Sequence, residues 1–382
     1  MPLTLGVPRE SWPDERRVAL PPDALKRLAR SGLEAVVERG AGAGAFIDDA
    51  AFEAVGARLG SRADALGADI VATVRGVAEA DLAALRPGAV LIGLLRPLDE
   101  PTAMQRYAAS GATVVAMELV PRTTRAQKMD ALSAMSTVAG YRAVLLAAAH
   151  LPKFFPLLTT AAGTVRPARV LILGAGVAGL QALATARRLG AITAGYDVRA
   201  AAREQVESVG AAFVELDLGT GDAEDAGGYA KALAADDATR QVAALATVVA
   251  GYDVVISTAL IPGRAAPLLL SQAAVEGMTP GSVVVDLAAP NGGNCAVTVS
   301  GETIVHDGVT VMGPLDLASD MTVHASDMYG RTVAALIAEL VSDGALALDL
   351  SDEIQAGAVV AHGGAVVHER VRSLLSPPDP AA

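Results

Sequence analysis

Short apolar runs alternate with amphipathic stretches along the first third of the chain. The apolar runs include LTLGVP, DIVATV, AVLIGLL and ATVVAM, and helical stretches such as PPDALKRLARSG and EPTAMQRYAASG lie between them. Proline at a helix start and glycine just past its end recur, as helix capping predicts. Strands that alternate with helices indicate βαβ units and a parallel sheet.

A long, alanine-rich helix is predicted over residues 131–150, and a second α/β series follows it. Its runs VLILG, DVVIST and SVVVDLA are continuously apolar, which is typical of strands buried on both faces of a parallel sheet. The fold class we expect is α/β, with two Rossmann-like, doubly wound parallel-sheet domains and an inter-domain cleft. The predicted domains are residues 1–136 plus 318–382, which form a discontinuous first domain, and residues 137–317.

The pattern changes after Asp286. Alternating Val and Thr residues flank the sequence HDG, which predicts a hairpin arm over about 297–312. Such an arm would expose a free strand edge, and pairing with a second copy of the chain would remove that liability, so we expect a homodimer. A helix is predicted over 327–344, and the proline-rich end, 376–382, is expected to fray.

Composition narrows the possible functions. The chain has 382 residues, of which 52% are hydrophobic, and its net charge of −12 argues against binding a nucleic acid polyanion. The single cysteine, Cys295, excludes an internal disulfide, and the N-terminal segment lacks the apolar core of a signal peptide. The longest uncharged run, 170–186, is shorter than the roughly 20 residues of a membrane span. We therefore expect a cytoplasmic protein that does not itself cross a membrane.

The sequence GAGVAG follows an apolar strand and opens a helix. Its glycines, Gly174, Gly176 and Gly179, would give a tight turn, room for a pyrophosphate and close packing of the helix on the strand, with phosphate at the helix start near Val177. The next strand ends in Asp197, whose carboxylate can accept both ribose hydroxyls and would repel a 2′-phosphate. This predicts NAD rather than NADP, although the nearby Arg199 could tolerate a 2′-phosphate.

A polar cluster, ELVPRTTRAQKMDALSA, follows the last apolar run of the first series. Ligands of open α/β sheets lie beyond the carboxyl ends of strands, so Arg122, Gln127, Asp130 and Ser133 are candidates to face the cleft. The alternative is a solvated loop in which Asp130 only caps the long helix. Spacing alone does not separate these two interpretations.

Four longer stretches resemble one family. PRTTRAQKMDALSAMSTVAGYRAV, FFPLLTTAAGTVRPARVLILGAGVAGLQA, STALIPGRAAP and VVVDLAAPNGGNCAVTV are similar to the NAD(H)-binding component of proton-translocating NAD(P) transhydrogenase, the alpha subunit in bacteria. The resemblance covers nearly the whole chain.

The resemblance implies roles for particular residues. It implies that Arg122, Gln127 and Asp130 hold the nicotinamide end of NADH with Ser133 beside them, and that Tyr229 belongs to a mobile loop that closes over the nucleotide. It also places Ala259 and Leu260, in STALIPG, at the cofactor. No metal site is expected.

The chain also resembles soluble alanine dehydrogenase, which needs a general acid or base as well as a hydride. The position that resembles its catalytic histidine is Arg96, and the position of its catalytic aspartate is Pro290. Arginine does not release its proton and proline has none to give. None of the five histidines, at positions 150, 306, 324, 362 and 368, matches that role.

Hydride transfer between two nicotinamide rings needs no protein acid or base, only rings that are oriented and dry. The expected function is therefore transfer of hydride from NADH to NADP+ held by a partner beta subunit, with a membrane-spanning subunit that couples the transfer to proton movement. The resemblance implies a peripheral place on the cytoplasmic face of the inner membrane. The alternatives are a soluble amino-acid or 2-oxo-acid dehydrogenase and a non-catalytic NAD-binding module.

Overall fold

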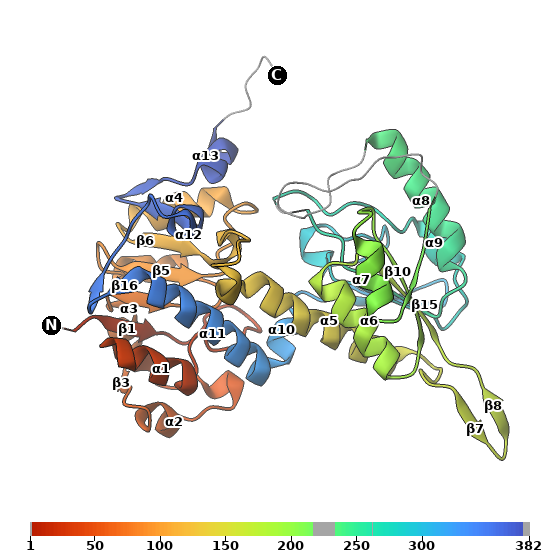
Figure 1. Cartoon of the computed structure of the whole chain (residues 1–382), viewed down its shortest axis with the longest axis horizontal. Helices are drawn as coiled ribbons and strands as arrows, with labels where there is room; N and C mark the ends of the chain where they lie inside the picture. The colour runs from red at the N-terminus through yellow and green to blue at the C-terminus, as the bar shows by residue number, and fades with distance from the viewer. Residues whose placement is uncertain (1, 217–233, 262, 377–382) are drawn as a thin grey trace. The chain divides into compact units, whose positions relative to one another are not determined.

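The computed structural model describes residues 2–216, 234–261 and 263–376 (Figure 1). It divides into two compact units. Unit 1 comprises Met1–Met135 and Ser319–Ala382, and unit 2 comprises Ser136–Ala318. Helices α5 (Ala131–His150) and α10 (Leu317–Asp320) run through the two unit boundaries.

The sheet of unit 1 has eight strands among the described residues. In spatial order they are β19 (Ala365–Val366), β18 (Val359–His362), β6 (Thr113–Ala116), β5 (Val90–Gly93), β4 (Ile70–Ala72), β1 (Thr4–Val7), β2 (Glu34–Glu38) and β3 (Arg58–Gly60). Strands β1 to β6 pair in parallel, and β18 joins β6 antiparallel. The C-terminal segment therefore completes the sheet that the N-terminal third begins.

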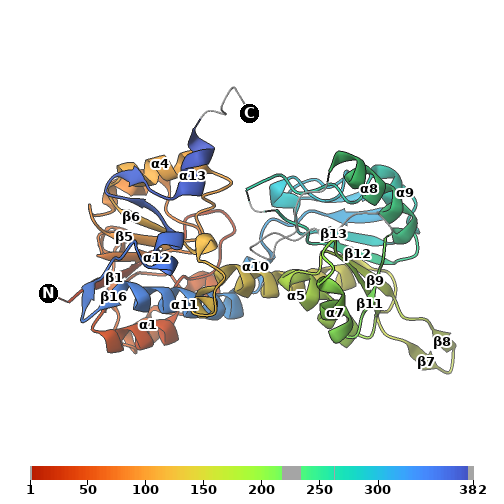
Figure 2. The same cartoon turned by 45° about the horizontal axis from the view of Figure 1, so that its top comes forward.

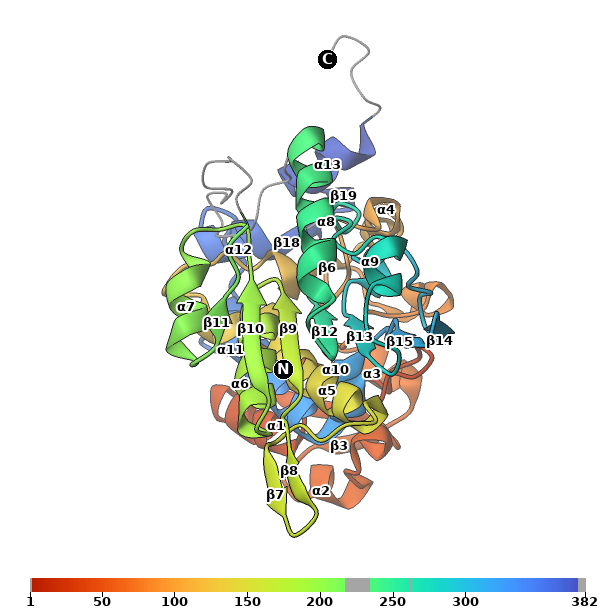
Figure 3. The same ribbon diagram turned by 90° about the vertical axis from the view of Figure 1, so that its right-hand side faces the viewer.

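The sheet of unit 2 has seven strands among the described residues, shown side by side in Figure 3. They are, in spatial order, β11 (Ala212–Phe213), β10 (Ile192–Tyr196), β9 (Arg169–Leu173), β12 (Val254–Ser257), β13 (Val283–Asp286), β15 (Val309–Met312) and β14 (Thr303–His306). All pairings are parallel except that of the edge strand β14 with β15. The predicted fold class of two doubly wound, parallel-sheet domains is confirmed.

Both sheets follow one rule of strand order. Counted along the chain within each unit, the parallel strands lie in the order 3-2-1-4-5-6. The order reverses between β1 and β4 in unit 1 and between β9 and β12 in unit 2. In such sheets ligands bind outside the carboxyl ends of the strands at this switch point. The fold thus offers one candidate crevice per unit.

Helices cover the faces of both sheets. In unit 1, α1 (Pro22–Leu28) packs beside α11 (Thr322–Leu340), and α4 (Pro101–Ala109) beside α13 (Glu369–Leu375) (Figure 2). The other helices are α2 (Asp49–Glu53), α3 (Arg62–Leu66), α6 (Val177–Arg188), α7 (Ala202–Ser208), α8 (Ala235–Val249), α9 (Gln272–Glu276) and α12 (Glu353–Ala358). The helix predicted over 327–344 is α11, which begins five residues earlier and ends at Leu340, where β16 (Val341–Ser342) starts.

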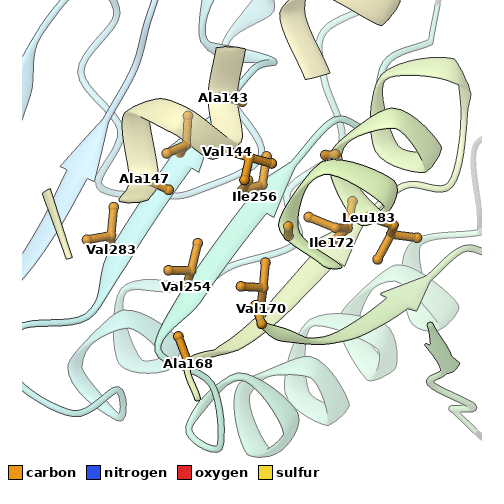
Figure 4. Packing of buried hydrophobic residues seen from close by; sticks show 14 of the residues in the cluster. Ala143, Val144, Ala147, Ala168, Val170, Ile172, Leu183, Val254, Ile256 and Val283 are labelled. Carbon is orange, nitrogen blue, oxygen red and sulfur yellow. The ribbon is translucent and has the colours of Figure 1, made fainter. Parts of the chain in front are cut away.

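The core of unit 2 joins α5 to the sheet. Figure 4 shows Ala143, Val144 and Ala147 of α5 over the strands β9, β12 and β13, whose Val170, Ile172, Val254, Ile256 and Val283 are fully buried. Among the described residues, α5 is the one helix long and apolar enough to cross a membrane by length and composition. Its buried side chains Ala143, Val144 and Ala147 pack into this core. The uncharged run 170–186 is not one helix but a strand, a turn and the start of α6.

The hairpin predicted around HDG is confirmed, because β14 pairs antiparallel with β15, but the prediction that it projects as an arm over 297–312 is wrong. The second half of this segment is β15, which pairs in parallel with β13 inside the sheet, and Val309, Val311 and Met312 are buried there. The apolar residues of β15 therefore pack into the core, whereas Val305 on the edge strand β14 is 70% exposed. The hairpin that does project is β7 (Leu158–Thr160) with β8 (Gly163–Val165), which extends away from the sheet of unit 2 in Figure 1.

Two partly buried glutamates lie at the carboxyl ends of strands in unit 1. Beyond β1, Glu10 accepts hydrogen bonds from the backbone N–H groups of Val74 at 2.7 Å and Arg75 at 3.1 Å. Beyond β6, Glu118 accepts one from the N–H of Arg96 at 2.6 Å, and its Oε2 is buried without a hydrogen-bond partner among the described residues. Burial raises the pKa of each carboxyl to about 7.

Glu118→Gln should remove one of these titrations and keep an acceptor for the Arg96 N–H. Because the folded-state pKa lies above the ordinary 4.5, wild-type Glu118 favours folding below pH 4.5, and this contribution is lost as pH rises to about 7. The free energy of unfolding of the wild type relative to the variant should fall by up to roughly 3 kcal/mol over that window.

Urea unfolding of both proteins at pH 4.5 to 8 measures this difference. Glu10 is present in both proteins, so its own titration cancels. Two curves that run parallel across the whole pH range would contradict the assigned role of Glu118.

Candidate functional site

The glycine turn of unit 2 connects β9 to α6 at the switch point. Gly174 has φ +97°, a backbone conformation that residues other than glycine rarely adopt. A Cβ on Gly179 would lie 1.8 Å from the carbonyl oxygen of Gly174, so helix and turn can approach only because residue 179 is glycine. A Cβ on Gly176 would meet nothing within 4 Å, which leaves open space at the start of α6. That space is where a helix N-terminus attracts phosphate.

Asp197 lies just after β10, and its carboxylate is already hydrogen-bonded to other residues of the chain. Its Oδ2 accepts from the N–H of Ala175 at 2.8 Å and from Arg199 Nη2 at 2.8 Å, and its Oδ1 accepts from the backbone N–H and Nε of Arg199, each at 2.9 Å. Burial would raise the pKa of this carboxyl, but the hydrogen bonds from Arg199 outweigh it and hold the pKa below its ordinary value. The sequence predicted a carboxylate open to a ribose, whereas here Arg199 neutralises it.

The segment Thr258 to Leu260 follows β12 on the other side of the switch point. Thr258 Oγ1 donates to the carbonyl of Gly174 at 2.9 Å, so this segment borders the glycine turn directly. The N–H of Ala259 donates to Asn294 Oδ1 at 3.1 Å, and Leu260 is 43% exposed. Gly174, Gly176, Val177, Gly179, Asp197, Arg199, Ala259 and Leu260 thus lie together at the switch point of unit 2.

The polar cluster of unit 1 lies beyond β6. Short 3-10 turns at Met117–Leu119 and Gln127–Met129 shape it, and Arg122 and Gln127 are exposed. Asp130 precedes α5, and its carboxylate accepts from the Ser133 N–H at 2.8 Å and from Ser133 Oγ at 2.5 Å. The helix-capping role considered for Asp130 is therefore present, and it fixes Asp130 and Ser133 together.

Arg125, in the same cluster, was missed by the sequence reasoning. It forms a short ion pair with Asp352 and a longer one, at 3.5 Å, with Glu339. Asp352 also caps α12 by accepting from the N–H groups of Ile354 at 2.9 Å and Gln355 at 3.2 Å. The loop is thus attached to the C-terminal segment of unit 1, and no local pattern could reveal a partner 227 residues away.

The switch point of unit 1 carries no glycine turn. The Glu10 carboxyl occupies the N–H groups beyond β4 that could otherwise bind an anion. A hollow of ≈ 710 Å³ lies beside it, lined by Arg9, Glu10, Trp12, Glu15, Arg16, Arg17, Glu38 and Arg62, among others. Its charges are largely paired internally, since Arg17 binds Glu15 and Arg62 binds Glu38. This crevice does not resemble a phosphate site.

The residues at the two positions compared with alanine dehydrogenase have no proton to exchange. Arg96 lies in a left-handed turn at φ 54° and pairs with Asp99 at 3.4 Å and Glu100 at 3.2 Å. Pro290 lies in the short turn Ala289–Asn291. The described residues contain no group of three His, Cys, Asp or Glu side chains placed to hold a metal ion. Tyr229, predicted to belong to a closing loop, lies outside the described residues.

Comparison with known families covers both units. Residues 6–139 match the model "Alanine dehydrogenase/PNT, N-terminal domain", and residues 143–369 match "Alanine dehydrogenase/PNT, C-terminal domain".

Relatives of similar length include both kinds of protein in that family. The chain is 42% identical over 376 residues to the first polypeptide of the NAD(P) transhydrogenase alpha subunit of Rhodospirillum rubrum, covering 96% of this chain and 98% of the relative. It is 30% identical to alanine dehydrogenase of Mycobacterium tuberculosis, covering 98% of each. A crystal structure of transhydrogenase from Sinorhizobium meliloti superposes with a TM-score of 0.87 at 42% identity, covering 95% of this chain and 100% of that one. The chain therefore belongs to the alanine dehydrogenase/PNT family and is a homologue of NAD(P) transhydrogenase subunit alpha.

Proposed function

We propose that this chain binds NADH and passes its hydride to NADP+ held by a separate subunit. The glycine turn and the start of α6 hold the pyrophosphate, Asp197 with Arg199 meets the adenosine ribose, and Leu260 gives an apolar contact. Arg122, Gln127 and Asp130 orient the dihydronicotinamide. Binding would place the two rings within hydride-transfer distance, roughly 3 to 3.5 Å between reacting carbons.

One observation carries this proposal over an amino-acid dehydrogenase. Reduction of a carbonyl or imine requires a group that donates a proton, and the two comparable positions hold Arg96 and Pro290. Arg96 is also held by two carboxylates, Asp99 and Glu100. Transfer between nicotinamide rings has no such requirement.

The proposal includes partners. The relatives named transhydrogenase alpha subunits imply further subunits, and we assign to them the NADP(H) site and the membrane-spanning part that couples hydride transfer to proton movement. This chain would then be a peripheral component on the cytoplasmic face of the inner membrane.

The preference for NADH over NADPH should depend on the Asp197–Arg199 pair. In Asp197→Ala the guanidinium of Arg199 loses its carboxylate partner and can bind a 2′-phosphate, so NADPH affinity should rise about tenfold or more. Calorimetry with both nucleotides measures the change. The double variant Asp197→Ala with Arg199→Ala is the control and should gain less NADPH affinity, because it loses the repulsion of Asp197 but offers no guanidinium. Similar wild-type affinities for NADH and NADPH would contradict the assignment.

The decisive experiment mixes the purified chain with an NADP(H)-binding transhydrogenase subunit, NADH and an NADP+ analogue whose reduction is visible. Reduction should require both proteins. The chain alone should not oxidise NADH with pyruvate and ammonia, and clear turnover there would favour the alanine dehydrogenase activity instead. If both proteins hold their nucleotides and nothing is reduced, the chain is a binding module.

The same assay tests the polar cluster. Gln127→Asn shortens the side chain by one methylene and keeps its amide, so the ring is misplaced while most nucleotide contacts remain. Turnover should fall roughly 10- to 100-fold with the NADH dissociation constant nearly unchanged. Gln272→Asn, on the exposed helix α9, is the matched control.

We propose further that the chain is a homodimer and that the β7–β8 hairpin, not the segment 297–312, makes the contact. An isolated two-stranded hairpin is marginally stable in water. Around this one, Phe154, Leu157, Val165 and Ile192 are 42–59% exposed. A second copy related by two-fold symmetry would cover these side chains on both chains at once.

Leu157→Asp with Val165→Asp should convert the dimer to a monomer, because two charges would be buried at each contact. Sedimentation at micromolar concentration measures the mass of each species. The control variant Val305→Asp changes an exposed position on β14 and should remain dimeric. A monomeric wild type, or a dimer lost only in the control, would contradict this contact.

A further inference from the structure

Asp286 ends β13, is fully buried and is the centre of a polar network. Its side chain accepts five hydrogen bonds, from Ser257 Oγ at 2.9 Å, Ala288 N at 3.0 Å, Asn294 N at 2.8 Å, Cys295 N at 3.1 Å and Thr298 Oγ1 at 2.9 Å. Five donors satisfy a carboxylate that burial would otherwise penalise strongly. The network therefore fixes the course of the chain from Ala288 to Thr298.

Asn294 connects this network to the segment after β12, which borders the glycine turn. It is completely buried. Its side-chain Oδ1 accepts from the N–H of Ala259 at 3.1 Å, and its Nδ2 donates to the carbonyls of Ala259 at 2.9 Å and Pro267 at 2.8 Å. One amide side chain thus binds both polar backbone groups of Ala259.

Ala259 lies directly beside the glycine turn, so a displacement of Ala259 would affect that turn. A Cβ on Gly174 would lie 3.2 Å from the N atom of Ala259 and 2.7 Å from Oγ1 of Thr258. The segment after β12 therefore touches the turn after β9, so its position affects the conformation of that turn.

We propose that Asn294, held by Asp286, is a positioning residue for the nucleotide site. It fixes the peptide of Ala259 against the glycine turn. The N–H of Ala259 donates to Asn294 and is therefore not available to the nucleotide. This segment can then contact the nucleotide through the side chain of Leu260. The inference rests on the proposed binding of NADH at this turn.

Two substitutions of Asn294 test the proposal. Asn294→Asp keeps the shape but turns the Nδ2 donor into an acceptor that faces two carbonyl oxygens, and Asn294→Ala removes the side chain without adding charge. Each should weaken NADH binding to the isolated chain about tenfold or more, measured by NADH fluorescence well below the melting temperature. The amide of Ala259 should also exchange with deuterium faster.

Thr298→Val is the matched control, because it deletes one donor to the same Asp286 carboxylate and leaves the contacts of Asn294 with Ala259 intact. It should lower the melting temperature, as the Asn294 variants do, with NADH affinity within about twofold of the wild type and slow exchange at Ala259. Thr298→Val thereby separates positioning from general stability.

The possible outcomes are distinct. Unchanged NADH affinity in a folded Asn294→Ala protein would overturn the inference, and so would an equal loss of affinity in Thr298→Val at equal loss of stability. A wild-type chain that does not bind NADH would contradict the proposed function itself, whereas the exchange rate at Ala259 still reports whether Asn294 holds that peptide.

Discussion

The nucleotide crevice depends on one close approach between two backbones. Helix α6 can start at Val177 and lie flat against β9 only because Gly179 brings no Cβ to the carbonyl of Gly174. That contact directs the N-terminus of α6 into the switch point and brings Ala175 within reach of Asp197, while the carbonyl of Gly174 stays available to Thr258. A methyl group at position 179 would separate all of these parts together.

The two units use the same sheet topology in different ways. In unit 2 the switch point is open and is surrounded by glycine, a small segment after β12 and a buried support at Asp286. In unit 1 the N–H groups of Val74 and Arg75 beyond β4 are taken by Glu10, and the exposed polar residues follow β6 instead. Strand order therefore does not determine where a ligand binds. The side chains at the strand ends decide it.

Sequence patterns predicted the features that depend on residues close together along the chain. The apolar runs gave the parallel strands, the glycine spacing gave the turn, and Asp130 followed the rule for helix caps. Contacts between distant segments had no such signature. Alternating Val and Thr residues around HDG predicted the hairpin of β14 and β15, but not that β15 pairs with β13 inside the sheet. The same holds for Arg125 with Asp352, for Glu10 with Val74, and for Asn294 with Ala259. Asp197 lies just after its strand, as the pattern predicted, but its pairing with Arg199 changes what it offers to a nucleotide.

The occupied crevice of unit 1 has a consequence for stoichiometry. Although the chain repeats a nucleotide-binding topology, Glu10 takes the N–H groups of Val74 and Arg75 in unit 1, and the proposed function assigns the nucleotide to unit 2. On the proposed function, each chain then carries one hydride at a time, and a two-fold assembly carries two. If nucleotide binding and release alternate within such an assembly, they must alternate between the two chains, because each chain binds only one nucleotide.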